Sequence, residues 1–324
     1  MRAPKASMVV LTLNAGAGFG ALLDRLLARD GPFDHEVLVV DSGSTDGTVE
    51  LARQRGAAVH RLSPGEFEHG ATRNLAISLS RGEYVAFIVQ DALPLDERWL
   101  PAMVEILERD ERVAGVYGRQ LPRLGCGPLS RVLVKDWPTA ATDRREQFVE
   151  DPSRYAALSP SGRRSLALFD NVSSCVRRSV WEKFPFDKTP FGEDVRWGKK
   201  VVEAGYKLVY EPRSAVYHSH ERGAIYHVRR HYAEGLVLLD LFGFAPTPNL
   251  PRLLLNALRS WAYLFLRLRR DERASGGVPR HALLAVGYAV PSQLGAYLAA
   301  KNRRLTRRSP RLSAALDRFV GGSV

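Results

Sequence analysis

Carboxylates follow two of the most apolar stretches of this 324-residue chain. Asp91 comes shortly after the run at residues 84–89, and Asp41 comes directly after the run at residues 36–40. Such runs are typical of strands buried on both faces of a parallel sheet, and open α/β sheets bind ligands at the carboxyl ends of their strands. Both carboxylates are therefore candidate ligand contacts, although a turn residue or a helix N-cap explains a single aspartate equally well.

Small polar residues fill the turns after the first two predicted strands. Residues 41–48 contain two carboxylates, hydroxyl groups and two glycines, which cannot pack a core and instead let the backbone approach a ligand. Thr12 and Asn14 lie at the corresponding place, where the first predicted strand ends. Arg73 lies in the first turns of a predicted helix, where an arginine can bind phosphate, although a solvated arginine is the simpler interpretation.

Two further clusters with chemical potential lie later in the chain. Glu193 and Asp194 stand at the start of a predicted helix, where they also interact favourably with the helix dipole. His218 and His220 lie on the same face of a predicted strand, because side chains alternate along strands. Two such imidazoles are more often incidental than metal ligands, but a neighbouring Asp91 would make a metal site the better interpretation.

These side chains need a scaffold that brings strand ends together. Strand and helix patterns alternate from residue 7 to residue 117, which predicts a parallel α/β sheet. Residues 121–165 lack a clear periodicity, and we expect a long mobile loop that acts as a lid. From about residue 225 the pattern becomes helical and basic, and residues 275–277, Ser-Gly-Gly, are the clearest linker between helices.

The composition is that of a soluble globular protein, with 45% hydrophobic and 25% charged residues. The two cysteines, Cys126 and Cys175, are too few for a disulfide framework and suit a reducing cytosol. We expect no secretory signal before the first strand. The apolar stretch at residues 282–300 is interrupted by Pro291 and two polar residues, which predicts a poor transmembrane span.

Positive charge is concentrated at the end of the chain. Residues 221–324 hold 17 Lys and Arg but 6 Asp and Glu, so they carry +11 of the net charge of +12. A basic helical tail that contains aromatic residues predicts a polyanionic partner, either a membrane surface or a nucleic acid. A helical subdomain packed on the rest of the protein, with its arginines in solvent, explains the tail equally well.

The order and spacing of these motifs resemble the family 2 glycosyltransferases of the GT-A fold. Within that family, residues 67–74 and 90–94 are similar to bacterial rhamnosyltransferases. The resemblance covers roughly residues 7–240. It implies a Rossmann-like mixed sheet flanked by helices, in a catalytic domain at residues 1–224 with a donor half at about 1–120 and an acceptor half at about 121–224. Residues 225–324 would form a basic helical C-terminal region.

The resemblance also implies roles for individual residues. Asp194 would be the catalytic base, and Glu193 and Trp197 would contact the acceptor. Asp41 would contact the base of a nucleotide-sugar, Asp46 its ribose side and Arg73 its diphosphate. The full set of implied donor-binding residues is Thr12, Asn14, Asp41, Ser42, Gly43, Ser44, Asp46, Arg73, Gln90 and Asp91.

A divalent cation is the implied cofactor. Asp91 stands where the family's D-x-D motif has its last aspartate, whereas Val89 replaces the first one. His218 or His220 would then complete a site for Mg²⁺ or Mn²⁺, and imidazole ligands favour Mn²⁺.

The function that follows is inverting transfer of L-rhamnose from dTDP-L-rhamnose to a hydroxyl of a glycan or lipid-linked acceptor, in cell-surface polysaccharide synthesis. The enzyme would be cytoplasmic or peripheral at the cytoplasmic face of the inner membrane. The sequence does not decide whether it forms a homodimer. Alternatives are a transferase that uses a UDP- or GDP-sugar, a nucleotidyltransferase and a basic nucleic-acid-binding protein. Polar strand ends argue against nucleic acid as the partner, and the absence of lysine between Asn14 and Asp41 argues against the nucleotidyltransferase.

Overall fold

The computed structural model describes residues 3–28, 31–271 and 277–320. Its contacts divide the chain into two compact units. The first unit comprises Met1–Arg123 and Trp137–His218, and the second comprises Leu124–Asp136 and Ser219–Val324. The second unit thus combines the basic C-terminal region with a segment from the middle of the chain.

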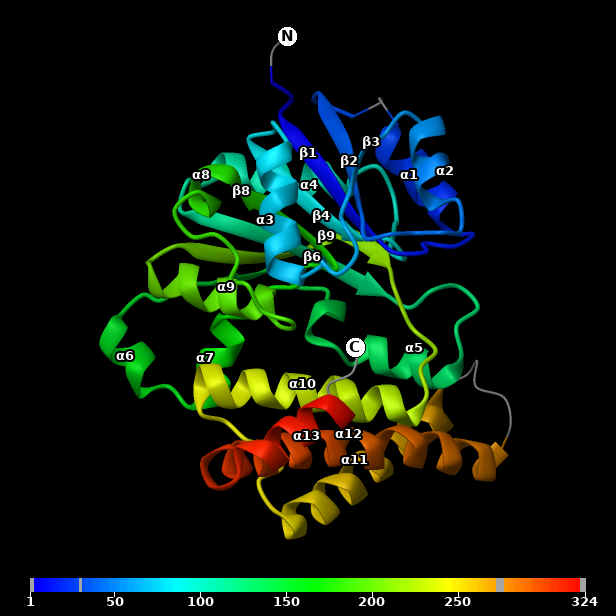
Figure 1. Cartoon of the computed structure of the whole chain (residues 1–324), viewed down its shortest axis with the longest axis vertical. Helices are drawn as coiled ribbons and strands as arrows, with labels where there is room; N and C mark the ends of the chain where they lie inside the picture. Colours follow the sequence, from blue (N-terminus) through cyan, green and yellow to red (C-terminus); the bar gives the residue numbers. More distant parts are fainter. Residues whose placement is uncertain (1–2, 29–30, 272–276, 321–324) are drawn as a thin grey trace. The chain divides into compact units, whose positions relative to one another are not determined.

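The strands of the described residues form one nine-stranded mixed sheet in the first unit (Figure 1). Their order is β3-β2-β1-β4-β8-β6-β9-β5, with β7 paired to β9. The strands are β1 (Ala6–Thr12), β2 (His35–Asp41), β3 (Ala58–Arg61), β4 (Tyr84–Val89), β5 (Leu93–Pro94), β6 (Val113–Leu121), β7 (Arg145–Gln147), β8 (Ser173–Arg177) and β9 (Lys207–Tyr217). Strands β1 to β4 run parallel where they pair, whereas β8 runs antiparallel to both β4 and β6. This arrangement confirms the predicted mixed sheet.

Helices cover both faces of the sheet because its central strands are apolar on both sides. Helices α1, α2 and α4 pack on one face, with Val10 of β1, and helices α3, α8 and α9 pack on the other, with Val9 (Figure 1). The helices of the first unit are α1 (Phe19–Leu27), α2 (Thr48–Gln54), α3 (His69–Leu79), α4 (Trp99–Arg109), α6 (Pro152–Ala157), α7 (Pro160–Leu166), α8 (Arg178–Trp181) and α9 (Glu193–Glu203).

The strand register brings the predicted polar residues to one edge of the sheet. Thr12 pairs with Asp41 across β1 and β2, and Leu11 pairs with Val89 across β1 and β4. The loops that follow these three strands therefore leave the sheet side by side.

The prediction of a long mobile loop at residues 121–165 is wrong. This segment contains α5 (Pro128–Lys135), a 3₁₀ turn at Pro138–Ala140, β7, α6 and α7. Proline at the first helical position, where no amide donor is needed, starts α5, α6 and α7. The side chains of Asp151 and Ser159 cap α6 and α7. These helices are too short to show a periodic pattern in the sequence.

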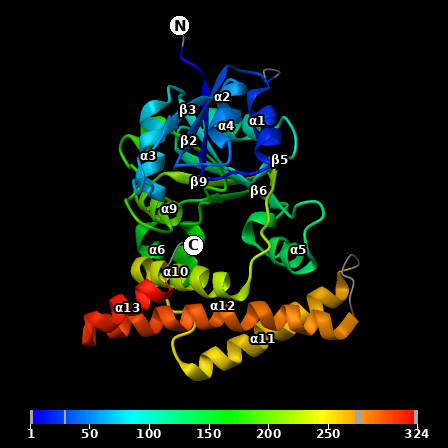
Figure 2. The same ribbon diagram turned by 45° about the vertical axis from the view of Figure 1, so that its right-hand side comes forward.

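The second unit is helical. It consists of α5, α10 (Ala224–Phe242), α11 (Leu250–Arg270), α12 (Gly277–Arg308) and α13 (Pro310–Val320). Figure 2 shows α12 lying along α10 and crossing α11. Helix α5 joins this unit through an ion pair of 2.7 Å between Arg131 Nε and Asp271 Oδ2.

One helix among the described residues, over Gly277–Leu305 of α12, is long and apolar enough to cross a membrane by length and composition. Pro291 lies inside α12 without ending it. That this segment is a poor membrane span stays a prediction. Of the linker predicted at 275–277, the first two residues lie outside the described residues, and Gly277 begins α12.

Candidate active site

The loops after β1 and β2 are organised around the buried carboxylate of Asp41. Asp41 has no exposed surface, and it accepts hydrogen bonds from Thr12 Oγ1 at 3.0 Å, Gly43 N at 3.0 Å and Ser44 N at 2.9 Å. Burial opposes ionisation, but these hydrogen bonds outweigh it and lower the pKa of Asp41. The carboxylate therefore shapes the turn that would receive a ligand.

A second set of hydrogen bonds ties the two loops together. Asn14 N donates to Ser44 Oγ at 2.8 Å, and Thr45 N donates to Asn14 Oδ1 at 2.9 Å. Asp46 accepts from Gly16 N at 3.2 Å, and its hydrogen bond from the Thr48 hydroxyl lowers its pKa. Asn14 has φ +48°, a left-handed conformation that asparagine tolerates better than most residues. The two loops form one polar platform at the sheet edge.

Gln90 connects this platform to the end of β4. Its side-chain amide pairs with the backbone of Leu13, which donates to Oε1 at 2.8 Å and accepts from Nε2 at 3.1 Å. Because Gln90 is held in this way, the next residue, Asp91, projects from a fixed backbone. A strand end that is held by two hydrogen bonds to its neighbour gives a precise position for a ligand atom.

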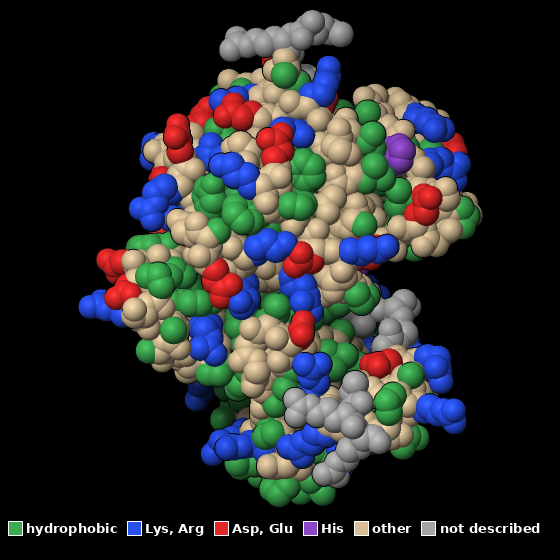
Figure 3. Space-filling view, turned by 60° about the vertical axis from the view of Figure 1, so that its left-hand side comes forward, with side chains coloured by type: hydrophobic (Ala, Val, Ile, Leu, Met, Phe, Trp, Pro, Cys, Tyr) green, Lys and Arg blue, Asp and Glu red, His purple; other side chains and the backbone are tan. Residues whose placement is uncertain are grey.

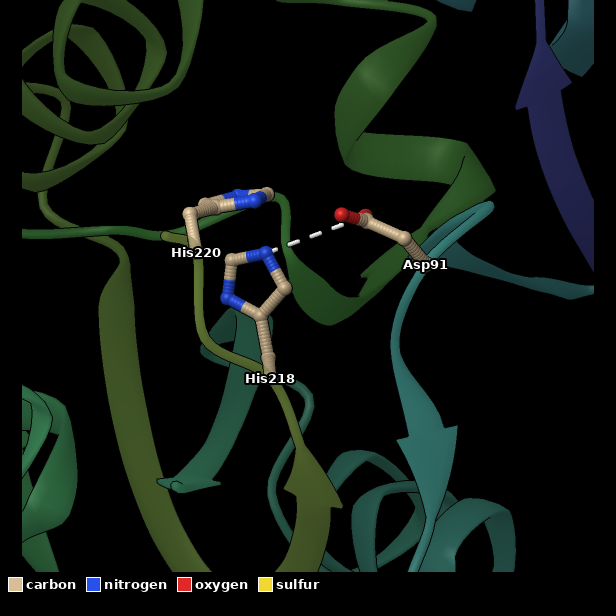
Figure 4. Close-up of side chains that lie close together, drawn as sticks. All are labelled: Asp91, His218 and His220. Atoms are coloured by element: carbon tan, nitrogen blue, oxygen red, sulfur yellow. Dashed lines mark ion pairs between the residues drawn. The ribbon is translucent and has the colours of Figure 1, made fainter. Parts of the chain in front are cut away.

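Asp91 lies close to the two predicted histidines. The ligand atoms of Asp91, His218 and His220 all lie within 4.8 Å of one another, and Figure 4 shows Asp91 pointing toward both imidazoles. His218 Nε2 lies 3.8 Å from Asp91 Oδ1. The three side chains that the resemblance implies as cation ligands therefore lie together, and that they bind a cation stays a prediction.

The orientation of His218 suits a metal ligand. Its Nδ1 lies 2.9 Å from Gln120 Oε1, and Gln120 Nε2 donates to Asp170 Oδ2 at 2.6 Å. Asp170 therefore directs the carbonyl oxygen of Gln120 toward the imidazole, which places a proton on Nδ1 and turns Nε2 toward Asp91. Metal-binding histidines are oriented by such partners, and a carboxylate with imidazoles is a donor set that fits a divalent cation.

Arg73 and Glu193 pair with each other. Arg73 Nη1 lies 2.9 Å from Glu193 Oε1, and both side chains are about nine-tenths buried or more. Asn171 also donates to Glu193 Oε1, at 3.1 Å. The predictions that Arg73 faces the diphosphate and that Glu193 contacts the acceptor therefore do not describe this structure, because each side chain already has a buried partner.

Asp194 lies in the first turn of α9, directly after Glu193 of this ion pair. Gly192, at φ +76°, caps the helix in a left-handed conformation and turns the chain into α9. Asp194 is half-buried, and burial together with the negative charges of Glu193 and Asp170 raises its pKa to about 7. A carboxylate with this pKa can accept a proton near neutral pH, as a general base must.

Trp197 belongs to the core. Its side chain has no exposed surface, its indole packs against Phe169 and Phe186, and its Nε1 donates to Phe184 O at 2.8 Å. The prediction that Trp197 contacts the acceptor is therefore wrong. Tryptophan on the inner face of an amphipathic helix is more often a core residue than a sugar platform.

The sequence interpretation missed three residues of the site. Gln120 and Asp170 orient His218, and Arg123 Nη2 lies 3.7 Å from Asp91 Oδ2. Gln120 and Arg123 follow the predicted strand at 113–117, so the rule that identified Asp91 could have identified them. Asp170 precedes its strand and carries no comparable signal.

Comparisons with known proteins agree with this geometry. The model of the family Glycosyl transferase family 2 matches residues 7–164. The O-antigen chain rhamnosyltransferase RfbN of Salmonella typhimurium is 29% identical over 237 residues, which is 72% of each protein. The N-acetylglucosaminyl-diphospho-decaprenol L-rhamnosyltransferase of Mycobacterium tuberculosis is 30% identical over 269 residues, which cover 72% of this chain and 83% of that protein.

A solved structure supports the fold. The mannosyltransferase PcManGT from Pyrobaculum calidifontis, in complex with GDP-Man and Mn²⁺, superposes with a TM-score of 0.55 at 22% identity. The match covers 95% of this chain and 89% of that one. At this identity the likeness shows the fold, and it confirms the predicted GT-A architecture.

Proposed function

The chain belongs to glycosyl transferase family 2, and on that premise we propose that it transfers L-rhamnose from dTDP-L-rhamnose to a hydroxyl of a glycan or lipid-linked acceptor. The choice of rhamnose is supported by two relatives from different organisms that carry rhamnosyltransferase names and match this chain over 72% of its length. The site geometry supports the transfer chemistry, and the observation that carries it is the pair of Asp91 and His218 at the sheet edge.

The donor would bind over the platform made by the loops after β1, β2 and β4. The residues that we propose to form it are Thr12, Asn14, Asp41, Ser42, Gly43, Ser44, Asp46, Gln90 and Asp91. Asp41 would act mainly through the turn that it organises, because its own carboxylate is enclosed. Arg123 takes the place of Arg73 as the proposed contact to the diphosphate, because it is partly exposed and lies beside Asp91.

A divalent cation would be held by Asp91, His218 and His220. When bound, such a cation stabilises the negative charge of the departing nucleoside diphosphate. The His218–Gln120–Asp170 chain of hydrogen bonds supports this proposal, because it holds Nε2 of His218 toward Asp91, where both groups can be ligands of one ion. Imidazole ligands favour Mn²⁺ over Mg²⁺.

Asp194 would accept the proton of the acceptor hydroxyl as its oxygen attacks the anomeric carbon. Attack on the face opposite the leaving diphosphate inverts the configuration at that carbon. The raised pKa of Asp194 keeps its basicity high enough for the transfer. Glu193, kept ionised by Arg73, would hold a negative charge next to this base and support its raised pKa, whereas the charge of Arg73 itself opposes that rise.

The lipid-linked class of acceptor leads us to propose that the enzyme works at the cytoplasmic face of the inner membrane.

The test of the proposed function is a transfer assay with dTDP-L-rhamnose, UDP-sugars and GDP-sugars in parallel. Of these donors, we expect that only dTDP-L-rhamnose supports turnover. Turnover that favours a UDP- or GDP-sugar would discard rhamnose and leave the transferase mechanism in place.

A further inference from the structure

Helix α11 carries apolar side chains on two opposite sides. Leu253, Leu264 and Leu268 are buried. Five other leucines of the same helix are exposed, with exposed fractions between 39% and 62%. Leu250 is the first residue of the helix, and we call the other four the leucine row: Leu254, Leu255, Leu258 and Leu266.

The leucine row lies along one side of the helix. At 100° per residue, its members fall within an arc of roughly 120°, whose middle lies opposite Leu253 and Leu264, whereas Leu268 lies next to one edge. Arg252, Arg259 and Arg270 fall just beyond one edge of that arc, and all three are exposed. Arg269, also exposed, falls inside the arc at the C-terminal end of the helix. The outer surface of α11 is therefore an apolar stripe with guanidinium groups along one border and at its C-terminal end.

Single exposed leucines are common on protein surfaces, but several exposed leucines on one side of a helix indicate a binding surface. The unit that contains α11 is strongly basic, because residues 221–324 carry 17 Lys and Arg against 6 Asp and Glu. Figure 3 shows hydrophobic side chains next to Lys and Arg on the surface of this unit. The partner must therefore combine an apolar interior with negative charge.

An anionic bilayer surface meets both requirements. A nucleic acid would pair with the arginines but would leave the leucines in contact with its phosphates or with water. A second copy of this chain would cover the leucines but would bring an equal positive charge to the same interface. A helix with an apolar stripe edged by arginine lies in the plane of a membrane, with its arginines reaching lipid phosphates.

We propose that the leucine row of α11 and its flanking arginines dock the protein on a membrane rich in anionic phospholipid. This proposal deepens the proposed function and rests on it for the lipid-linked acceptor, but the surface itself is independent of the catalytic site. Docking of this kind is peripheral, so its affinity depends on salt and alkaline carbonate can extract the chain from the membrane.

The test is sedimentation of the full chain with vesicles, without donor or acceptor. Vesicles of phosphatidylglycerol mixed with phosphatidylcholine are compared with vesicles of phosphatidylcholine alone, at low and at high salt. We expect binding to the anionic vesicles at least about tenfold tighter than to the neutral ones, and weaker at high salt. Equal binding to both vesicles would overturn the proposal, and so would binding that resists alkaline carbonate, because it would indicate insertion of α12.

A matched pair of variants identifies the surface. Leu254→Glu with Leu258→Glu should lower affinity for anionic vesicles at least about tenfold, because two charges would enter the apolar boundary. Leu79→Glu with Leu158→Glu makes the same change in charge at exposed leucines of the first unit and should bind as the unaltered chain does. Circular dichroism establishes that both variants fold.

Replacing Arg252, Arg259 and Arg270 by Gln should remove most of the salt-dependent part of the binding without touching the apolar row. If the leucine-row variant binds vesicles as the control does and changes from dimer to monomer in light scattering, the proposal is overturned. The leucine row would then bind a second copy of this chain. Donor titration of the same proteins separates the two proposals. Vesicle binding without any nucleotide binding would refute the proposed function and leave the docking surface standing.

Discussion

Arg73 Nη1 lies 2.9 Å from Glu193 Oε1 in the interior of the first unit, beside the half-buried Asp194. Burial alone would drive Glu193 toward its neutral form, but the charges of Arg73 and His69 and the hydrogen bond from Asn171 lower its pKa. The chain therefore keeps a fixed negative charge next to Asp194. Arg73 thus acts on the proposed base in two opposite ways: it keeps Glu193 ionised, which raises the pKa of Asp194, and its own charge lowers that pKa.

Breaking this ion pair should destabilise the fold. Arg73→Met leaves Glu193 buried and charged, and we expect the free energy of unfolding to fall by about 3–5 kcal/mol. The double variant Arg73→Met with Glu193→Gln should recover part of that loss, because both charges are gone. Urea unfolding of the single and double variants measures the coupling. Losses that simply add would mean that the two groups do not interact.

Replacing the proposed base should stop transfer and leave donor binding intact. In Asp194→Asn no carboxylate accepts the proton of the acceptor hydroxyl, and we expect turnover to fall by about 10²–10⁴-fold. Initial rates and donor titration are measured on the same protein. Asp240→Asn, an exposed position on α10, is the matched control and should be fully active. Normal turnover by Asp194→Asn would remove this residue from its role.

The activity should depend on pH through Asp194. The base works in its ionised form, so kcat/KM should rise with pH and level off above about 7, the value to which burial and the neighbouring Glu193 raise the pKa of Asp194. Glu193→Gln removes one of these causes and should move the rise to lower pH. A pH profile that is unchanged in Glu193→Gln would contradict the electrostatic role of the ion pair.

The same raised pKa has a consequence for stability. The pKa of Asp194 in the folded chain, about 7, lies above the ordinary aspartate value of 3.8, so ionisation of Asp194 destabilises the fold as the pH rises from below 3.8 to above 7. Asp194→Asn should therefore match the unaltered chain in Tm at about pH 4 and exceed it at about pH 8. Thermal unfolding at both pH values checks the sign. A Tm of Asp194→Asn that exceeds that of the unaltered chain only at about pH 4 would contradict this sign.

Gln120 should matter for metal binding although it would not touch the ion. Gln120→Leu removes the acceptor that fixes the Nδ1 proton of His218, and we expect affinity for Mn²⁺ to fall by about 10–100-fold. Direct titration with Mn²⁺ measures this without any turnover. Gln54→Leu, at an exposed position on α2, is the control. Equal affinity in the two variants would show that His218 needs no such orientation.

The parts of the site that follow from strand ends were predictable from the sequence. Asp91 and the segment at 41–48 come after apolar runs, and parallel pairing brings such ends to one edge. The Arg73–Glu193 pair was not predictable in this way, because its members are far apart in sequence and nothing in a single chain indicates which buried charges pair. Trp197 was misassigned for a related reason, since burial on a helix face and stacking on a sugar use the same residue type.

The most direct test of the account is a calorimetric titration with dTDP-L-rhamnose, UDP-sugars and GDP-sugars, in the presence of Mn²⁺ and of a chelator. We expect dTDP-L-rhamnose to bind best, at least about tenfold more tightly with Mn²⁺ than with the chelator. Asp91→Asn should lose that difference, because the cation would lose its carboxylate ligand. Binding of no nucleotide by the intact chain, with or without Mn²⁺, would contradict the account, since the platform around Asp41 and the Asp91–His218 pair would then have no donor to hold.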